Sequence, residues 1–151
     1  MGFTSFLKST KFFKDLSDED LAALEQFSEL KKYKKNEMIF SEEEAGDQLF
    51  IIKSGTAKVL RQIKNEEQTI VILNPGEFFG EMALFDKHPR SASVKMMEDG
   101  ELVVLKKASY EKMKSEAPGT AIKLNEIVIT TLSDRLRQAN RNFEVISFWL
   151  T

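Results

Sequence analysis

The feature that most restricts the fold is a series of short segments rich in β-branched residues, spread over residues 47–107. Glycine, proline, asparagine and aspartate separate the segments, as expected of strands joined by turns. The segments read DQLFIIKSG, TAKVLRQI, QTIVILNPG, SASVKMME and ELVVLKK. Asn74-Pro75-Gly76 is predicted to form a tight turn, because proline fixes φ and glycine is free to adopt a positive φ.

Three of these strands are predicted to be buried on both faces. Apolar residues occupy both faces of Leu49–Ile52, Thr69–Leu73 and Leu102–Leu105. A strand buried on both sides needs a layer packed on each face, which indicates two layers of sheet. We therefore expect an α+β protein built on an antiparallel β-roll, of the double-stranded β-helix or jelly-roll type.

Helices are predicted before the roll. Ser17 precedes three acidic residues, and Ser17 with Asp20 suits a helix N-terminus and its positive dipole end. The spacing of Leu21, Leu24 and Phe27 predicts a helix over Asp18–Phe27. An earlier short helix around Phe3–Phe13 would present Phe3, Phe6, Leu7 and Phe13 to the same core.

Helices are also predicted after the roll, where strand signals stop near Lys107. A short helix over Ala108–Glu116 would end at Pro118-Gly119, and one long helix would follow over Thr120–Leu150. Its apolar residues alternate in steps of three and four over three heptads, at Ile129, Leu132, Leu136, Ala139, Phe143, Ile146 and Leu150. Such a face could pack on its own domain. We favour a homodimer seam, because the heptads continue past the length that a compact roll could cover.

Composition bounds the remaining possibilities. A chain of 151 residues suits one domain, with N-terminal helices in 1–28, the β-roll in 29–107 and C-terminal helices in 108–151. The chain has no cysteine, a net charge of −2, and no run of 18 apolar residues. We expect a cytoplasmic protein with no thiolate metal site, no membrane segment and no basic surface for nucleic acid.

The residues that carry chemistry lie in Gly76–Val94, GEFFGEMALFDKHPRSASV. Gly80 allows a close backbone approach, and the Glu81 carboxylate can accept hydroxyl protons. Met82-Ala83-Leu84 offers consecutive backbone N–H groups, Arg90 a planar fork for phosphate, and Ser91-Ala92 a hydroxyl and further N–H groups. A carboxylate, a guanidinium and a cradle of amides together suit a sugar phosphate.

This stretch resembles the phosphate-binding cassette of cyclic-nucleotide-binding domains, the family of the bacterial catabolite activator protein and of cyclic-AMP-dependent kinase regulatory subunits. The similarity rests on Gly80-Glu81-Met82-Ala83-Leu84 and on Arg90-Ser91-Ala92. Upstream, Gly46-Asp47-Gln48-Leu49-Phe50-Ile51-Ile52 and Gly55 resemble the glycine-and-strand signature of that family. The resemblance covers Phe12–Asn142 and implies a ligand-binding domain rather than an enzyme.

The resemblance also implies roles for individual residues. Glu81 would accept the ribose 2′-hydroxyl beside the Gly80 backbone, and Arg90 would pair with the cyclic phosphate. The backbone N–H groups of Ala83, Ser91 and Ala92 would complete the anion site. Ile70, Val71 and Phe79 match positions that wall the pocket, although they would serve equally well as ordinary core. Arg135 and Asn140 lie near the positions that contact the base.

The ligand implied is cyclic AMP, with cyclic GMP as the alternative. Kinase relatives that prefer cyclic GMP often place threonine after the arginine, where this chain has Ser91. A scaffold of the same fold without a ligand is the rival function, and the intact Glu81 and Arg90 argue against it. The single histidine, His88, has no partner nucleophile or metal-ligand set in the sequence and suits a solvated loop.

We also expect no sequence-specific DNA binding. In the catabolite activator relatives a helix-turn-helix domain follows the long helix, and no recognition helix or basic stripe occurs in these 151 residues.

Overall fold

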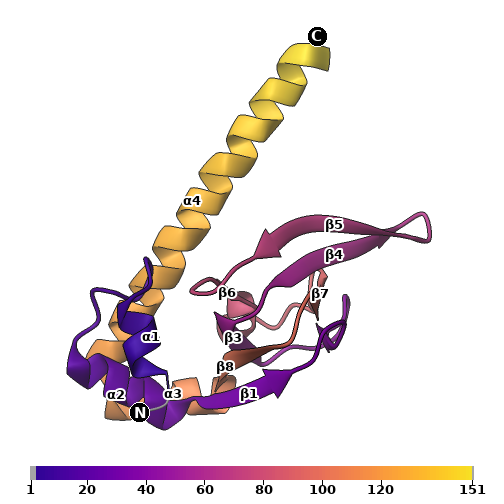
Figure 1. Cartoon of the computed structure of the whole chain (residues 1–151). Helices are drawn as coiled ribbons and strands as arrows, with labels where there is room; N and C mark the ends of the chain where they lie inside the picture. The colour runs from indigo at the N-terminus through magenta and orange to yellow at the C-terminus, as the bar shows by residue number, and fades with distance from the viewer. Residues whose placement is uncertain (1–2, 151) are drawn as a thin grey trace.

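The computed structural model describes residues 3–150 of the chain, and the side chains of residues 3–143. It consists of a two-sheet β-roll with helices at both ends of the sequence (Figure 1). The helices are α1 (Thr4–Lys8), α2 (Asp18–Phe27), the 3₁₀ helix η1 (Glu81–Leu84), α3 (Lys107–Glu116) and α4 (Pro118–Leu150). The strands are β1 (Glu29–Tyr33), β2 (Met38–Phe40), β3 (Gln48–Ser54), β4 (Ala57–Ile63), β5 (Glu66–Leu73), β6 (Phe78–Phe79), β7 (Ser93–Met96) and β8 (Gly100–Lys106). The predicted α+β class and antiparallel roll are confirmed.

The eight strands form two antiparallel sheets of four, ordered β1-β8-β3-β6 and β2-β7-β4-β5. Strand alternation gives the first sheet two apolar faces. Leu49, Ile51 and Val103 belong to the cluster that packs on the helices, whereas Ile52 and Leu102 belong to the cluster shared with the second sheet. The prediction that Leu49–Ile52 and Leu102–Leu105 are buried on both faces is therefore confirmed.

The same prediction is wrong for Thr69–Leu73. In β5 only Leu73 is buried, and Ile70, Val71 and Ile72 are 55%, 46% and 47% exposed. The reason is position, since β5 is an edge strand that pairs with β4 alone. The β4–β5 hairpin runs out beyond the other sheet, so no layer covers either face of most of β5 (Figure 1).

The helix boundaries follow local chemistry. The N-terminal helix ends at Lys8 and not at Phe13, because the hydroxyls of Ser9 and Thr10 donate to the Phe6 and Leu7 carbonyls and close the last turn. Helix α2 has the predicted bounds. Helix α4 begins at Pro118, where a helix needs no backbone N–H, so this proline starts the long helix two residues earlier than predicted.

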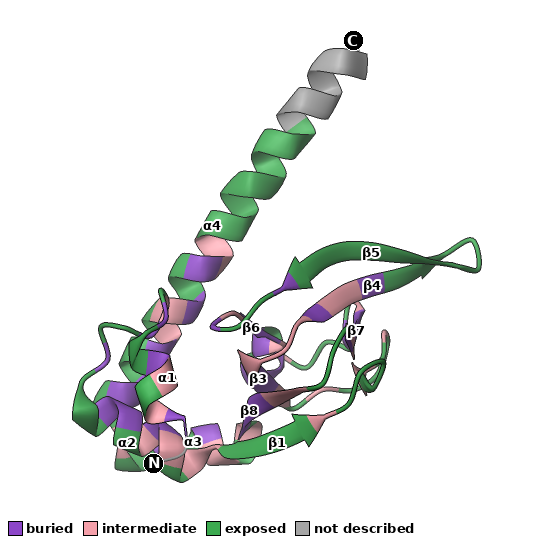
Figure 2. Cartoon of the chain, viewed as in Figure 1, coloured by how far each residue is buried: buried purple, intermediate pink, exposed green. Residues whose placement is uncertain are grey.

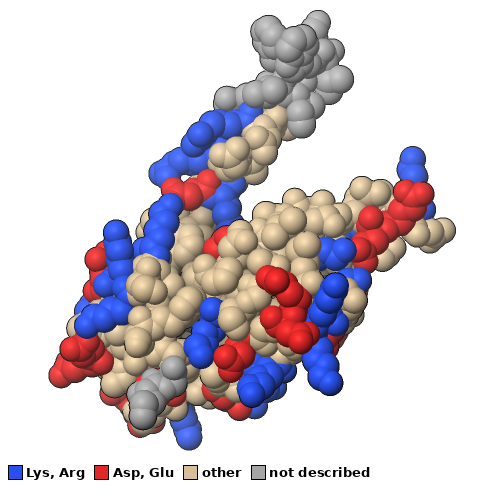
Figure 3. All heavy atoms as spheres, in the orientation of Figure 1, with Lys and Arg blue, Asp and Glu red and all other residues tan. Residues whose placement is uncertain are grey.

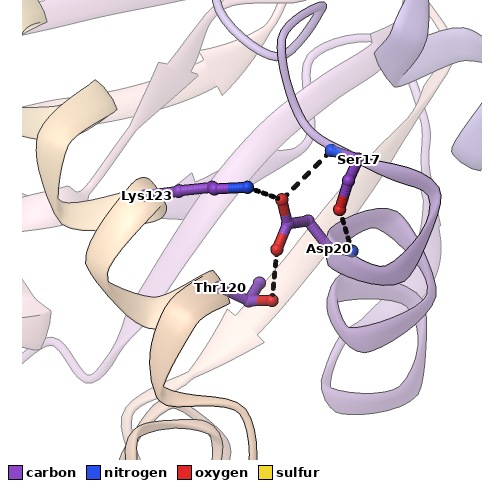
Figure 4. A network of polar contacts seen from close by, with 4 residues as sticks. All are labelled: Ser17, Asp20, Thr120 and Lys123. Atoms are coloured by element: carbon purple, nitrogen blue, oxygen red, sulfur yellow. Dashed lines mark hydrogen bonds and ion pairs between the residues drawn. The ribbon is translucent and has the colours of Figure 1, made fainter.

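A buried carboxylate joins the start of α4 to α2 (Figure 4). Asp20 closes a capping box with Ser17 and also accepts hydrogen bonds from Thr120 Oγ1 at 2.7 Å and Lys123 Nζ at 2.6 Å. Burial opposes ionisation of Asp20, but the hydrogen bonds from Lys123, Thr120 and Ser17 outweigh it and hold its pKa below the ordinary value. The first turn of α4 is thereby fixed to the N-terminal helices.

Beyond that anchor, α4 leaves the body of the molecule. Its first half is packed, with Leu124 and Val128 buried, and residues 134–143 further along the helix are exposed (Figure 2). Within the described residues, no helix combines the length and the apolar character needed to cross a membrane.

Candidate functional site

A cavity of about 460 Å³ opens between the second sheet, η1 and the loop that precedes β7. This volume lies in the range of small-molecule sites in proteins. Its lining includes most of the predicted cassette. The lining residues are Phe40, Val59, Phe79, Gly80, Glu81, Met82, Ala83, Asp86, His88, Pro89, Arg90, Ser91, Ala92, Val94 and Arg135.

Gly80 creates the bend that forms one wall. The chain leaves β6 with Gly80 at φ 75°, a left-handed conformation that favours glycine, and then enters η1. A Cβ atom at this position would lie 2.9 Å from Arg90 Nη1 and 3.0 Å from the Gln48 carbonyl oxygen. The glycine therefore serves both the turn and the close approach of the arginine.

Arg90 is held by the backbone, and it is 9% exposed. Its Nη1 and Nη2 groups donate to the carbonyls of Gly80 and Gln48, each at 3.0 Å. Its Nε atom is buried, and no hydrogen-bond partner for it exists among the described residues. Burial lowers the pKa of Arg90, while the negative charges of Asp47, Glu44 and Glu81 act in the opposite direction. Within the described part of the chain no carboxylate lies within 4.0 Å of this guanidinium.

Glu81 is also buried, at 5% exposed, and its partner comes from the long helix. Arg135 Nη1 donates to Glu81 Oε1 at 2.9 Å, and Nη2 donates to the Phe78 carbonyl at 3.0 Å. Arg135 thus lines the cavity, and in addition it ties α4 to the cassette. No sequence pattern predicts this ion pair, because its two residues are 54 positions apart.

Four predicted site residues lie away from the cavity lining. Leu84 is buried in the core that the helices share, where Leu49 and Tyr110 also lie. Ile70 and Val71 are exposed on the edge strand β5, so they belong neither to the pocket wall nor to the core, the two positions expected for them. Asn140 is exposed on the later part of α4.

Several lining residues were not predicted from the sequence. Phe40, Val59 and Val94 come from three strands of the second sheet, and nothing in a strand pattern separates such residues from core. His88 lies in a loop, as the sequence predicts, with its side chain 86% exposed. It also lines the cavity beside Asp86, with Nδ1 3.6 Å from Oδ1. In the described part of the chain no three acidic or histidine side chains are placed to hold a metal ion.

The cavity therefore presents a buried guanidinium and a buried carboxylate on apolar walls. The free N–H groups of Arg90 suit an anion, and Glu81 suits hydroxyl donors. The family model for the cyclic nucleotide-binding domain matches residues 30–116, which include β1 from its second residue, the whole cavity lining except Arg135, and α3. The chain belongs to this family.

Known proteins of the family share the architecture. The chain is 31% identical over 143 residues to the cyclic AMP receptor protein of Thermus thermophilus, an alignment that covers 94% of this chain and 64% of the receptor. It is 40% identical over 89 residues to a cGMP-dependent protein kinase of Toxoplasma gondii, covering 59% of this chain and 9% of the kinase. The crystal structure of a cyclic nucleotide-binding domain from Methylobacillus flagellatus superposes with a TM-score of 0.81 at 25% identity, covering 93% and 79% of the two chains. The chain thus spans less than two thirds of the length of these two curated relatives.

Proposed function

We propose that the cavity binds cyclic AMP and that the domain is a non-catalytic, cytoplasmic regulatory module. The observation that carries the proposal is Arg90, a buried cation that faces the cavity with backbone carbonyls as its only hydrogen-bond partners in the described residues. A buried charge without a counter-ion is unfavourable, so the site gains free energy from an anion. Glu81, across the same cavity, supplies the acceptor that a ribose hydroxyl needs.

The choice of cyclic AMP over cyclic GMP rests on one residue and one relative. Ser91 stands where cyclic-GMP-selective kinases often have threonine, and it lines the cavity. The Thermus protein, named as a cyclic AMP receptor, aligns over nearly the whole chain. The Toxoplasma protein, named as cGMP-dependent, has the higher identity over a shorter stretch, so cyclic GMP is the alternative ligand.

Calorimetric titration tests this proposal. We expect saturable binding of cyclic AMP with one site per chain, weaker binding of cyclic GMP, and none of cyclic di-nucleotides. A preference for cyclic GMP would overturn the choice of base while leaving the site assignment intact. Absence of binding by either cyclic mononucleotide would overturn the function and favour the scaffold role.

We further propose that ligand binding moves α4. Arg135 holds the helix to the carboxylate that would accept the ribose, so a nucleotide at Glu81 changes a contact between roll and helix. A ligand shifts a conformational equilibrium only through such differential contacts. The anchor at Asp20 keeps the first turn in place, and the exposed residues 134–143 leave the helix free to reorient there.

Hydrogen exchange along residues 120–150, with and without cyclic AMP, tests the coupling. We expect exchange to change in the turns around Arg135 and not in the first turn. The Asn140→Ala variant, run in parallel, tests the predicted base contact. A ligand that protects the roll and leaves α4 unchanged would make the domain a passive binder.

A homodimer through α4 is the assembly that we propose. Exposed apolar side chains recur every seven residues at Ile122, Ile129, Leu136 and Phe143, with exposed fractions of 57%, 64%, 63% and 69%. Leu132 is half-buried against the protein's own core, Ala139 is exposed, and the side chains of Ile146 and Leu150 lie outside the described residues. Figure 3 shows mainly uncharged side chains on the surface between α4 and the β4–β5 hairpin. The output would pass through this dimer or through a protein partner.

A further inference from the structure

We propose that Phe40 is a positioning residue that fixes the guanidinium plane of Arg90 for the phosphate. The inference deepens the proposed function and rests on it for the identity of the anion. The ring lies at the end of β2, and the centre of the guanidinium is 4.0 Å from the ring centroid. At this distance the cation packs on the face of the ring and gains cation–π attraction.

Besides the ring, the backbone of Gly46, the backbone of Gly80 and the Gln48 carbonyl surround the guanidinium. A Cβ atom on Gly46 would lie 2.2 Å from Arg90 Nε, and one on Gly80 would lie 2.9 Å from Nη1. The carbonyls of Gly80 and Gln48 then fix the rotation within the plane. Ring, backbone and carbonyls together leave the arginine one orientation before any ligand arrives.

That orientation leaves donors for a ligand. A guanidinium has five N–H groups, and the two carbonyl bonds engage one on Nη1 and one on Nη2. One N–H on each of these nitrogens has no partner in the described residues; the Nε–H is also unpaired there, but it is fully buried beside Gly46. A phosphate would meet donors already held in place, which removes the ordering cost that a mobile side chain would pay on binding.

Phe40 differs from the other two rings of its cluster. Phe50 and Phe79 stack with centroids 5.1 Å apart and are 2% and 4% exposed; Phe79 also lines the cavity, but neither ring lies within cation–π distance of Arg90. Phe40 packs against both at 5.9 Å, yet it is partly exposed, lines the cavity and contacts the arginine. Among the described aromatic rings, it is the one within cation–π distance of Arg90. Phe50→Leu is therefore a matched control that alters the same cluster without touching the guanidinium.

The first test needs no nucleotide. In ¹H–¹⁵N spectra of the free protein, Arg90 Nε–H is expected at an upfield, ring-shielded position with slow exchange. In Phe40→Leu the signal should move downfield and exchange faster, whereas Phe50→Leu should leave it in place. Phe40→Tyr should restore it, and Phe40→Met replaces the leucine variant if that fails to fold. An unmoved signal in the leucine and methionine variants overturns the proposal.

The second test separates positioning from direct contact with the ligand. Phe40→Leu is expected to weaken cyclic AMP binding roughly 3- to 30-fold, from the loss of one desolvated cation–π contact. In an Arg90→Ala background the same change should cost about twofold or less, because its effect passes through the arginine. An equal loss in both backgrounds overturns the positioning role. If the wild type binds no cyclic nucleotide, the proposed function fails, and the spectra alone decide the role of Phe40.

Discussion

Replacing the buried Asp20 with alanine should destabilise the fold more than the same replacement of the exposed Asp18 on α2. The variant loses the carboxylate half of the capping box, which accepts from the Ser17 N–H, and the hydrogen bond from Thr120, and it frees Lys123. The lost bond from the Ser17 N–H contributes about 1 kcal/mol, and a buried hydrogen bond to a charged group roughly 1.5–3 kcal/mol, whereas Ser17 Oγ still accepts from the backbone N–H of residue 20. The Lys123 side chain is 47% exposed, so solvent screens its contribution to well under about 1 kcal/mol. We expect a total loss of roughly 2–4 kcal/mol in the free energy of unfolding.

Urea denaturation followed by circular dichroism measures this loss, with Asp18→Ala as the control. Asp18 lies two positions earlier and pairs with Lys8 at 2.6 Å, but its side chain is 88% exposed. Solvent screens such a pair, and its removal should have a much smaller effect. Equal losses in the two variants would refute the assignment of Asp20 as the anchor of α4.

The pH dependence gives a second check on the same residue. The folded-state pKa of Asp20 lies below its ordinary value of 3.8, so the ionised form stabilises the fold. That stability is fully present at pH values well above 3.8 and is lost as the pH falls through 3.8 toward the folded-state pKa. The difference between the wild type and Asp20→Ala should be constant from about pH 7 to pH 5 and should shrink below about pH 4. A difference that grows on acidification would contradict the stated direction.

Three further substitutions test the site and the assembly. Gly46→Ala places a Cβ atom 2.2 Å from the arginine of the phosphate site and should weaken cyclic AMP binding about tenfold or more in calorimetry, whereas Gly119→Ala, with open space around it, should not. Glu81→Gln should weaken binding of cyclic AMP about tenfold but leave 2′-deoxy cyclic AMP nearly unaffected; equal losses would contradict the ribose assignment. Leu136→Glu should convert a dimer to a monomer in sedimentation analysis while Gln138→Glu does not, and a wild-type monomer would overturn the seam.

Patterns along the chain predicted the parts of the fold that local chemistry governs. The two-faced strands Leu49–Ile52 and Leu102–Leu105 and the capped helix Asp18–Phe27 all formed where expected. Strand β1 was not predicted, because Glu29–Tyr33 is a largely charged segment without a strand pattern. It is a strand because it pairs with β8. The apolar β5 reads like a core strand, and only the topology places it at an edge.

The cassette residues of the candidate site could be predicted from the sequence, but most of the contacts that they make could not. Gly80, Glu81 and Arg90 stand in one contiguous motif, so they could be predicted together. The partners of Arg90 could not, because two are backbone carbonyls and the third is a phenylalanine from a distant strand. No side-chain motif records such contacts. The pairing of Glu81 with Arg135 depends on how α4 packs, which heptad spacing does not specify.

Calorimetric titration of cyclic AMP into the wild type, Arg90→Ala and Arg61→Ala tests directly whether Arg90 forms the anion site for a cyclic nucleotide. Arg61 is an exposed arginine on β4 that pairs with Glu42, and it serves as the matched control. We expect Arg90→Ala to weaken binding by about one to two decades, the loss of a charge-assisted hydrogen bond, and Arg61→Ala to bind like the wild type. Unchanged affinity in Arg90→Ala would contradict the claim.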